Sequence, residues 1–128
     1  MAQGAGAKKI LIVDDESAIL QTLRFNLERN GYLVATAGDG RSAVALASSE
    51  RPDLVIMDIR LASETDGIAA ALEILDRTGI RCIFATAYAD AATRERGEKA
   101  RPFGWLHKPF TADVLLGAVK AALESRDD

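Results

Sequence analysis

Five side chains that could do chemistry together each stand at or just past the end of a short apolar run. They are Asp14, Asp15, Asp58, Thr86 and Lys108. Three carboxylates brought together repel, and each pair costs roughly 4 kcal/mol at ~4 Å and an effective dielectric near 20. Lys108 supplies one positive charge, and the remaining deficit suits a hard divalent cation with oxygen ligands, by default Mg²⁺. A carboxylate beside such a cation and an ammonium group can act as a nucleophile toward a phosphoryl group.

The elements that must position these side chains follow from the alternation of apolar runs with segments of helical character. The apolar runs cover residues 9–13, 32–37, 54–57, 81–86 and 103–107. The helical segments lie between Glu16 and Asn30, between Gly38-Asp39-Gly40 and Pro52, after a loop through Asp66-Gly67 up to Thr78-Gly79, over 89–101, and after Thr111. Strictly alternating strands and helices predict a parallel sheet with right-handed crossovers and helices on both faces. The carboxyl ends of parallel strands share one edge, so the five side chains converge there.

The strand sequences also indicate which strands are central. The first, third and fourth runs (ILIV, LVIM and CIFA) are continuously apolar, as strands covered on both faces should be. The second and fifth runs carry polar residues suited to edges. We therefore expect an α/β fold with a doubly wound five-stranded parallel sheet in the order 2-1-3-4-5, whose ligand site lies at the carboxyl ends of the strands.

The helical segments differ in how much they can bury. The segment 89–101 has alanines to bury and contains Gly97, so it gains little from packing and is expected to be the most mobile element. Thr111 is expected to cap the last helix, whose Val114, Leu115 and Val119 belong to a strong apolar stripe.

Length and charge restrict the function classes. The 128 residues carry 16 basic and 19 acidic side chains, a formal charge of −3, which lacks the basic excess that drives phosphate-backbone binding. We expect one domain over 8–126, a disordered segment 1–7, and no direct nucleic-acid partner. The single cysteine, Cys82, and the absence of a signal peptide or a long apolar run indicate a reduced cytoplasmic protein without a membrane segment.

Four motifs, in this order, resemble the receiver domain of two-component response regulators: LIVDDE, VIMDIR, FATAY and LHKPF. The resemblance spans residues 9–125 and implies the flavodoxin-like fold of the receiver type, for which the order 2-1-3-4-5 is known. It implies that Asp58 accepts a phosphoryl group from a sensor histidine kinase or a histidine-phosphotransfer protein. By the same resemblance Asp15 ligates Mg²⁺ directly, Asp14 ligates it through water, and the backbone carbonyl of Arg60 completes the protein ligands. Lys108 and Thr86 would contact the phosphoryl oxygens.

The resemblance also implies a switch. Phosphorylation adds negative charge and acceptor oxygens, which draw Thr86 inward, and an aromatic residue of the fifth strand, here Trp105, turns inward in the family. Because segment 89–101 is weakly packed beside them, we hypothesise that the fourth helix, the fifth strand and the fifth helix form the surface read by a partner. Arg60 and Tyr88 occupy positions that in the family influence access of water to the phosphoryl group, and their bulk suggests slow autodephosphorylation.

Several positions depart from the family pattern. Ala62 replaces the usual proline, and the loop 62–65 is one residue longer than usual. Trp105 is larger than the usual tyrosine or phenylalanine. The sequence is therefore compatible both with a side chain that rotates fully on phosphorylation and with one that packs in a single position. The Lys108–Pro109 peptide is expected to be cis, as in the family.

Three other functions are alternative interpretations of the same residues. A phosphatase with a strand-end aspartate nucleophile needs a second aspartate two residues on, and Arg60 stands there. A flavin-binding module needs a phosphate loop after the first strand, where Asp14, Asp15 and Glu16 would repel a phosphate. A receiver-like interaction module without phosphorylation is a further alternative, but the intact set of Asp15, Asp58, Thr86 and Lys108 argues against it.

The resemblance leaves the assembly and the output of the chain open. We expect a stand-alone chemotaxis-regulator-like protein that is a monomer or a phosphorylation-dependent dimer. Its output would be a surface change read by a downstream protein, or a phosphoryl group passed on through a relay.

Overall fold

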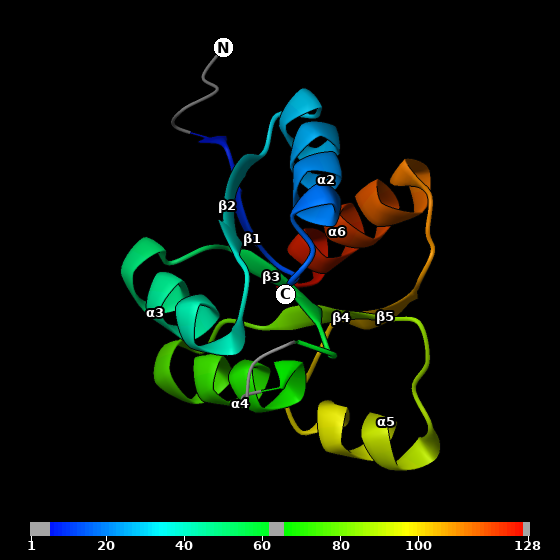
Figure 1. Cartoon of the computed structure of the whole chain (residues 1–128). Helices are drawn as coiled ribbons and strands as arrows, with labels where there is room; N and C mark the ends of the chain where they lie inside the picture. The colour runs from blue at the N-terminus through cyan, green and yellow to red at the C-terminus, as the bar shows by residue number, and fades with distance from the viewer. Residues whose placement is uncertain (1–5, 62–65, 127–128) are drawn as a thin grey trace.

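Five parallel strands form one sheet in the order β2-β1-β3-β4-β5 (Figure 1). The computed structural model describes residues 6–61 and 66–126. The strands are β1 (Lys9–Val13), β2 (Leu33–Ala37), β3 (Leu54–Asp58), β4 (Cys82–Thr86) and β5 (Gly104–His107). The helices are α2 (Ser17–Arg29), α3 (Gly40–Glu50), α4 (Gly67–Thr78), α5 (Ala91–Glu98) and α6 (Ala112–Arg126). The predicted alternation and strand order are confirmed.

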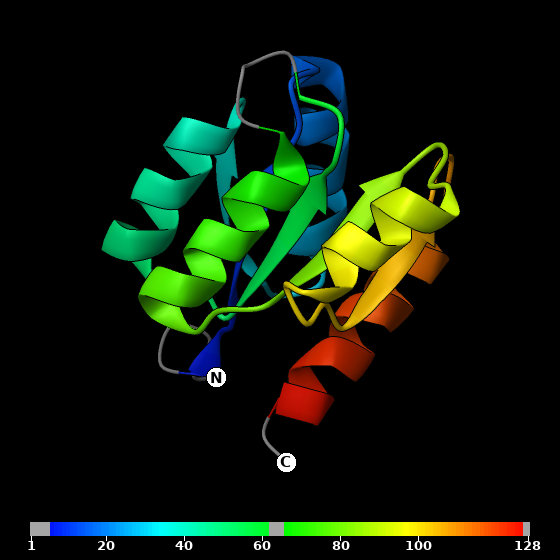
Figure 2. The ribbon, with the colours of Figure 1, turned by 90° about the horizontal axis from the view of Figure 1, so that it is seen from below.

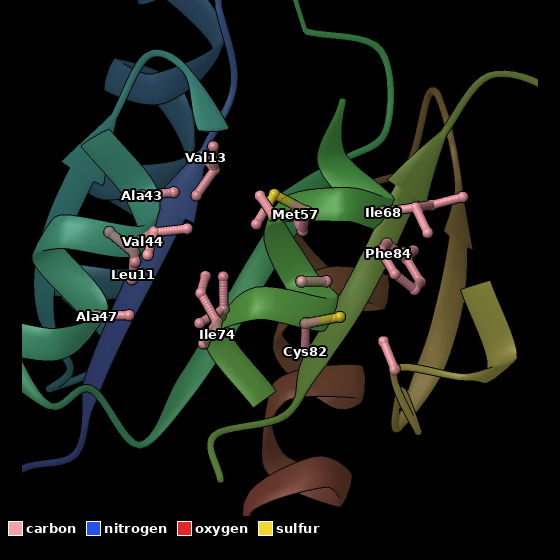
Figure 3. Close-up of a cluster of buried hydrophobic side chains, with 14 of the residues drawn as sticks. Leu11, Val13, Ala43, Val44, Ala47, Met57, Ile68, Ile74, Cys82 and Phe84 are labelled. Carbon is pink, nitrogen blue, oxygen red and sulfur yellow. The ribbon is translucent and has the colours of Figure 1, made fainter. Parts of the chain in front are cut away.

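The helices cover the sheet in two layers. Figure 2 shows α3, α4 and α5 on one face and α2 and α6 on the other. Successive side chains of a strand point to opposite faces, so Leu11 and Val13 pack on the α3–α4 side, while Ile10 and Ile12 pack on the α2–α6 side. Figure 3 shows part of the hydrophobic core on the α3–α4 side of the sheet. Strands β3 and β4 are buried along their whole length, as predicted for central strands.

Aspartate side chains start three of the helices. Asp39, Asp66 and Asp90 each accept a hydrogen bond of 2.8 Å from the backbone N–H three residues further on, which satisfies one of the free donors of the first turn. The Thr111 hydroxyl accepts from the Val114 N–H at 3.2 Å, so this predicted cap is confirmed. At the start of α2 the Glu16 side chain makes no capping hydrogen bond.

The helix predicted over 89–101 is shorter in the structure. Helix α5 ends at Glu98, and Arg101 has a left-handed backbone with a φ of 52°. After Glu98 the chain makes a tighter turn with hydrogen bonds from the N–H groups of residues 99, 100 and 101 to the carbonyls three residues earlier. The helix cannot continue, because Pro102 follows and a residue before a proline avoids the helical backbone conformation.

Other expectations about single positions have mixed outcomes. The Lys108–Pro109 peptide is cis, as expected. Cys82 is buried in the core, and burial raises the pKa of its thiol. The expectations about residues 1–5, Ala62 and the loop 62–65 lie outside the described residues. Among the helices that the structure describes, none is long and apolar enough to cross a bilayer.

Candidate functional site

Three carboxylates meet at the carboxyl ends of β1 and β3. The two strands are paired with Val13 opposite Met57, so the next residues, Asp14 and Asp58, leave the sheet side by side. One carboxylate oxygen from each of Asp14, Asp15 and Asp58 lies within 4.8 Å of the others. Asp14 and Asp58 are 3% and 6% exposed, whereas Asp15 is exposed to solvent. The parallel sheet thus gathers negative charge at one buried edge.

Lys108 lies between the two buried carboxylates. Its Nζ is 3.0 Å from Oδ2 of Asp14 and 3.4 Å from Oδ1 of Asp58. The chain holds the lysine in place after β5, because the Lys108 backbone N–H donates to the Thr86 carbonyl at 2.9 Å. A long side chain from an edge strand therefore brings the neutralising charge to the centre of the sheet.

Backbone N–H groups orient both buried carboxylates. Oδ1 of Asp14 accepts from the Glu16 N–H at 2.9 Å, and Oδ1 of Asp58 accepts from the Arg60 N–H at 3.3 Å. Lys108 also approaches Oδ1 of Asp58. Within residues 6–61 and 66–126, no hydrogen bond engages the other oxygen, Oδ2. Asp58 therefore has one oxygen fixed by the protein and one oxygen available for a ligand.

The electrostatics of the site follow from burial and charge pairing. Burial raises the pKa of Asp58, and the charge of Asp14 raises it further, while Lys108 opposes the shift. Burial lowers the pKa of Lys108, but its hydrogen bond to Asp14 and the charges of both aspartates outweigh this effect, so the net pKa is raised. Lys108 therefore carries its positive charge at neutral pH.

The donor set fits a hard divalent cation. Asp14, Asp15 and Asp58 offer carboxylate oxygens, which Mg²⁺ prefers, and bring three negative charges against the single ammonium group of Lys108. Asp15, the exposed member, leaves a side of the cluster open to water, and Mg²⁺ keeps several water ligands in protein sites.

Thr86 belongs to the same edge of the sheet, but its hydroxyl is engaged elsewhere. Ala85 pairs with Asp58 across β3 and β4, so Thr86 ends β4 one residue beyond the acceptor position. The Thr86 hydroxyl donates to the Tyr88 carbonyl at 2.9 Å and accepts from the Tyr88 N–H at 3.3 Å. The Tyr88 side chain is 65% exposed, and Arg60 is exposed as well. The structure thus gathers Asp14, Asp15, Asp58 and Lys108, with Thr86 turned toward the following loop.

Trp105 lies on β5, on the sheet face that carries α4 and α5. Its ring centroid is 4.9 Å from that of Phe84, and its indole Nε1 donates to Oε2 of Glu98 at 2.7 Å. The guanidinium carbon of Arg94 lies 4.7 Å from its ring centroid. Trp105 is therefore in contact with a helix and a neighbouring strand at the same time.

Gly67, the first residue of α4, is a site residue that the motif analysis did not single out. A Cβ at this position would lie 1.9 Å from the Asp58 carbonyl oxygen, and the Gly67 N–H donates to the Ile59 carbonyl at 2.9 Å. Helix α4 therefore packs its first turn directly against the backbone of the acceptor candidate. The sequence signal for this glycine is the Asp66–Gly67 pair before a predicted helix, which by itself indicates only a helix boundary.

A family model described as the response regulator receiver domain matches residues 10–120. The chain belongs to this family. Receiver domains are phosphoaccepting regulatory domains that bind Mg²⁺ at an acidic pocket, and this structure has a cluster of three aspartates at the sheet edge.

Named relatives agree with this assignment. The transcriptional regulatory protein PdtaR of Mycobacterium tuberculosis is 37% identical over 123 residues, which are 95% of this chain and 60% of that protein. The alkaline phosphatase synthesis transcriptional regulatory protein PhoP of Bacillus subtilis is 36% identical over 117 residues, 91% of this chain and 48% of that protein. This receiver chain thus spans about half to three fifths of the length of these curated relatives.

Solved structures share the fold over nearly the whole chain. A CheY-like receiver domain protein from Methanospirillum hungatei superposes with a TM-score of 0.90 at 29% identity, covering 95% of this chain and 98% of that one. The receiver domain of a modulated diguanylate cyclase from Desulfovibrio desulfuricans gives a TM-score of 0.87 at 34% identity, covering 94% and 97%.

Proposed function

We propose that the chain is a phosphorylation-dependent signalling switch that accepts a phosphoryl group on Asp58. A sensor histidine kinase or a histidine-phosphotransfer protein would be the donor, because the family works in two-component systems. The observation that carries the proposal is the position of Lys108, whose ammonium group lies 3.0 Å from Asp14 and 3.4 Å from Asp58. A fixed positive charge beside a carboxylate is what phosphoryl transfer to that carboxylate needs.

The transfer itself is a simple displacement. Oδ2 of Asp58, which no described residue engages, attacks the phosphorus atom of a phosphohistidine. A new P–O bond forms, the P–N bond breaks, and its electron pair returns to the imidazole nitrogen of the donor. Lys108 stabilises the negative charge on the phosphoryl oxygens, so the protein contributes mostly position and charge.

Asp14, Asp15 and Asp58 would hold Mg²⁺, with the Arg60 backbone carbonyl as the further ligand that the family resemblance implies. When bound, the ion supplies a second positive charge for the equatorial phosphoryl oxygens. Its ligands come from the ends of two adjacent strands, so the same residues place the cation and the nucleophile. Asp14 must then divide its oxygens between Lys108 and the ion.

The switch begins at Thr86. A phosphoryl group on Asp58 offers new acceptor oxygens, and the Thr86 hydroxyl can reach them only by leaving the Tyr88 carbonyl. The loop after β4 then moves. The surface formed by the fourth helix (α5), the fifth strand (β5) and the fifth helix (α6) changes as a result, and a partner or a relay protein reads this change. By the family resemblance, Arg60 and Tyr88 would limit the access of water to the phosphoryl group on Asp58 and so slow hydrolysis of the acyl phosphate.

The test is incubation with Mg²⁺ and a small phosphodonor, followed by intact mass measurement. We expect the wild type to gain one phosphoryl group and Asp58→Asn to gain none. The exposed aspartate of α4 provides a control, because Asp76→Asn should behave as the wild type. A wild type that gains no mass with several donors, or an Asp58→Asn variant that still gains it, would contradict the proposal.

A further inference from the structure

Helix α5 is held to the rest of the molecule mainly by polar contacts. Gly97 is the one buried residue within Ala91–Glu98. A helix of 8 residues with so little apolar burial is marginal on its own. One of its contacts is the ion pair between Arg96 and Asp66 at 3.2 Å, and Asp66 is also the cap of α4. Such exposed contacts are individually weak and reversible.

The densest contact of α5 is with Trp105 of β5, and we call Arg94, Gly97, Glu98 and Trp105 the indole clamp. Arg94 lies over the ring at 4.7 Å, and Glu98 accepts the indole N–H at 2.7 Å. Gly97 lets the helix backbone lie directly on the ring, because a Cβ there would be 2.5 Å from a ring carbon of Trp105. The indole ring of Trp105 thus contacts α5 through its face, its edge and its N–H group.

A cavity of about 160 Å³ connects this clamp to the end of β4. Its lining includes Thr86, Tyr88, Arg94 and Trp105. Thr86 and Tyr88 are joined by the hydroxyl–carbonyl hydrogen bond of 2.9 Å. Any movement that breaks this bond changes one wall of the cavity, and the indole ring and Arg94 form another wall. The clamp and Thr86, where the proposed switch begins, therefore border the same small space.

We infer that the indole clamp is an autoinhibitory contact in which the Glu98 carboxylate holds Trp105 and α5 in the unphosphorylated arrangement. The inference rests on the proposed phosphorylation of Asp58. An indole N–H can only donate, so an indole that leaves Glu98 must find another acceptor or water. The hydrogen bond to a charged acceptor therefore favours the arrangement in which it is made. Because coupling is reciprocal, removing it should make the phosphorylated arrangement easier to reach.

The single tryptophan of the chain is Trp105, so its fluorescence reports on the clamp directly. The experiment measures acrylamide quenching of Trp105 and titrates Mg²⁺-loaded protein with beryllofluoride, a mimic of a carboxylate-bound phosphoryl group. We expect Glu98→Ala to increase quenching in the absence of beryllofluoride. We also expect beryllofluoride to half-saturate Glu98→Ala at a concentration about three to ten times lower than the wild type needs. A factor of this size corresponds to the loss of one exposed hydrogen bond. Glu98→Gln keeps an acceptor and should lie between the two.

The matched control is Glu95→Ala, which removes an exposed carboxylate from the same helix and should leave both measurements unchanged. Equal quenching in the wild type, Glu98→Ala and Glu95→Ala would overturn the clamp. Increased quenching without a change in the beryllofluoride titration would overturn its regulatory role. A wild type that binds no beryllofluoride would contradict the proposed function and the regulatory role together, whereas the quenching comparison would still test the clamp.

Discussion

Helices α4 and α5 lie on the same face of the sheet but are held by different forces. Both begin at an aspartate cap with the same 2.8 Å hydrogen bond. Helix α4 buries Gly67, Ile68, Ala70, Ala71 and Ile74, whereas α5 buries only Gly97. Figure 2 shows the two helices side by side, with α4 over the middle of the sheet and α5 toward β5.

This difference separates a fixed helix, α4, from a conditional helix, α5, whose position depends, in the proposed switch, on the state of the phosphorylation site. Helix α4 must stay in place, because Gly67 lies against the backbone of Asp58 and any shift would displace the acceptor. No residue of α5 packs against the backbone of Asp58 in this way. Apart from the packing of Gly97 on the Trp105 ring, the contacts of α5 with Asp66 and Trp105 are polar and exposed to water. A signalling domain needs both: a rigid site for the chemistry, and an element of low stability to display the result.

The largest expected effect is the loss of α4 packing. Ile74 is 1% exposed in the core between α4 and the sheet, so Ile74→Ala should lower the free energy of unfolding by about 2–5 kcal/mol. Urea denaturation measures this change. The control in α5, Glu95→Ala, should stay within about 0.5 kcal/mol of the wild type. Similar losses in both variants would contradict the comparison.

The buried glycines of these two helices, Gly67 and Gly97, give the next largest difference. In Gly67→Ala the new methyl group meets the Asp58 backbone, which cannot move without moving the carboxylate. We expect a loss of about 1–3 kcal/mol of stability and phosphorylation slowed at least tenfold, roughly, since small misplacements are costly. In Gly97→Ala the methyl group meets the edge of the Trp105 ring, a side chain that can shift, and helix propensity improves by about 1 kcal/mol.

The measurements for this pair are urea denaturation, the rate of mass gain with a phosphodonor, and Trp105 fluorescence. Gly97→Ala should change the fluorescence with little effect on the phosphorylation rate, and Gly67→Ala should do the opposite. Gly38→Ala is the control, because nothing lies within 4 Å of a Cβ placed there. If both glycine variants slowed phosphorylation equally, the division into a fixed and a conditional helix would be wrong.

The strand order was predictable from the sequence for a physical reason. A strand covered on both faces is apolar along most of its length, so the sequences of β1, β3 and β4 indicate central strands. The aspartates at the ends of β1 and β3 then fall at one edge of the sheet. The convergence of Asp14, Asp58 and Lys108 needed only parallel strands in that order. The binding roles of these residues remain predictions.

The contacts that distinguish α5 could not be predicted in this way. Local patterning carries no information about a pair such as Arg96 and Asp66, which are 30 residues apart, or about which acceptor the Trp105 indole finds. The direction of the Thr86 hydroxyl depends on the loop that follows β4. The left-handed backbone of Arg101, which closes the turn after α5, could not be read from helix propensity. Each feature is set by tertiary packing and not by helix or strand propensity.

The smallest expected effect is a pH dependence of α5 that α4 does not share. The hydrogen bond from the Thr93 N–H holds the pKa of the Asp90 carboxyl below its usual value of 3.8. The unfolded helix therefore binds the proton more readily than the folded one, so the cap contributes fully above that value. Its contribution is lost as the pH falls through the lower, folded pKa. Helix α4 has the same kind of cap at Asp66, but core packing holds it in place without the cap.

Backbone chemical shifts of Ala91–Glu98 and Gly67–Thr78, followed by NMR from neutral pH to below the usual aspartate pKa, measure this difference. We expect α5 to lose helicity at the acid end while α4 keeps it. Asp90→Asn supplies a cap that does not titrate, so α5 should keep more of its helicity at low pH. If α4 and α5 lost helicity together, the two helices would form one cooperative unit, and α5 could not respond to the state of Asp58 on its own.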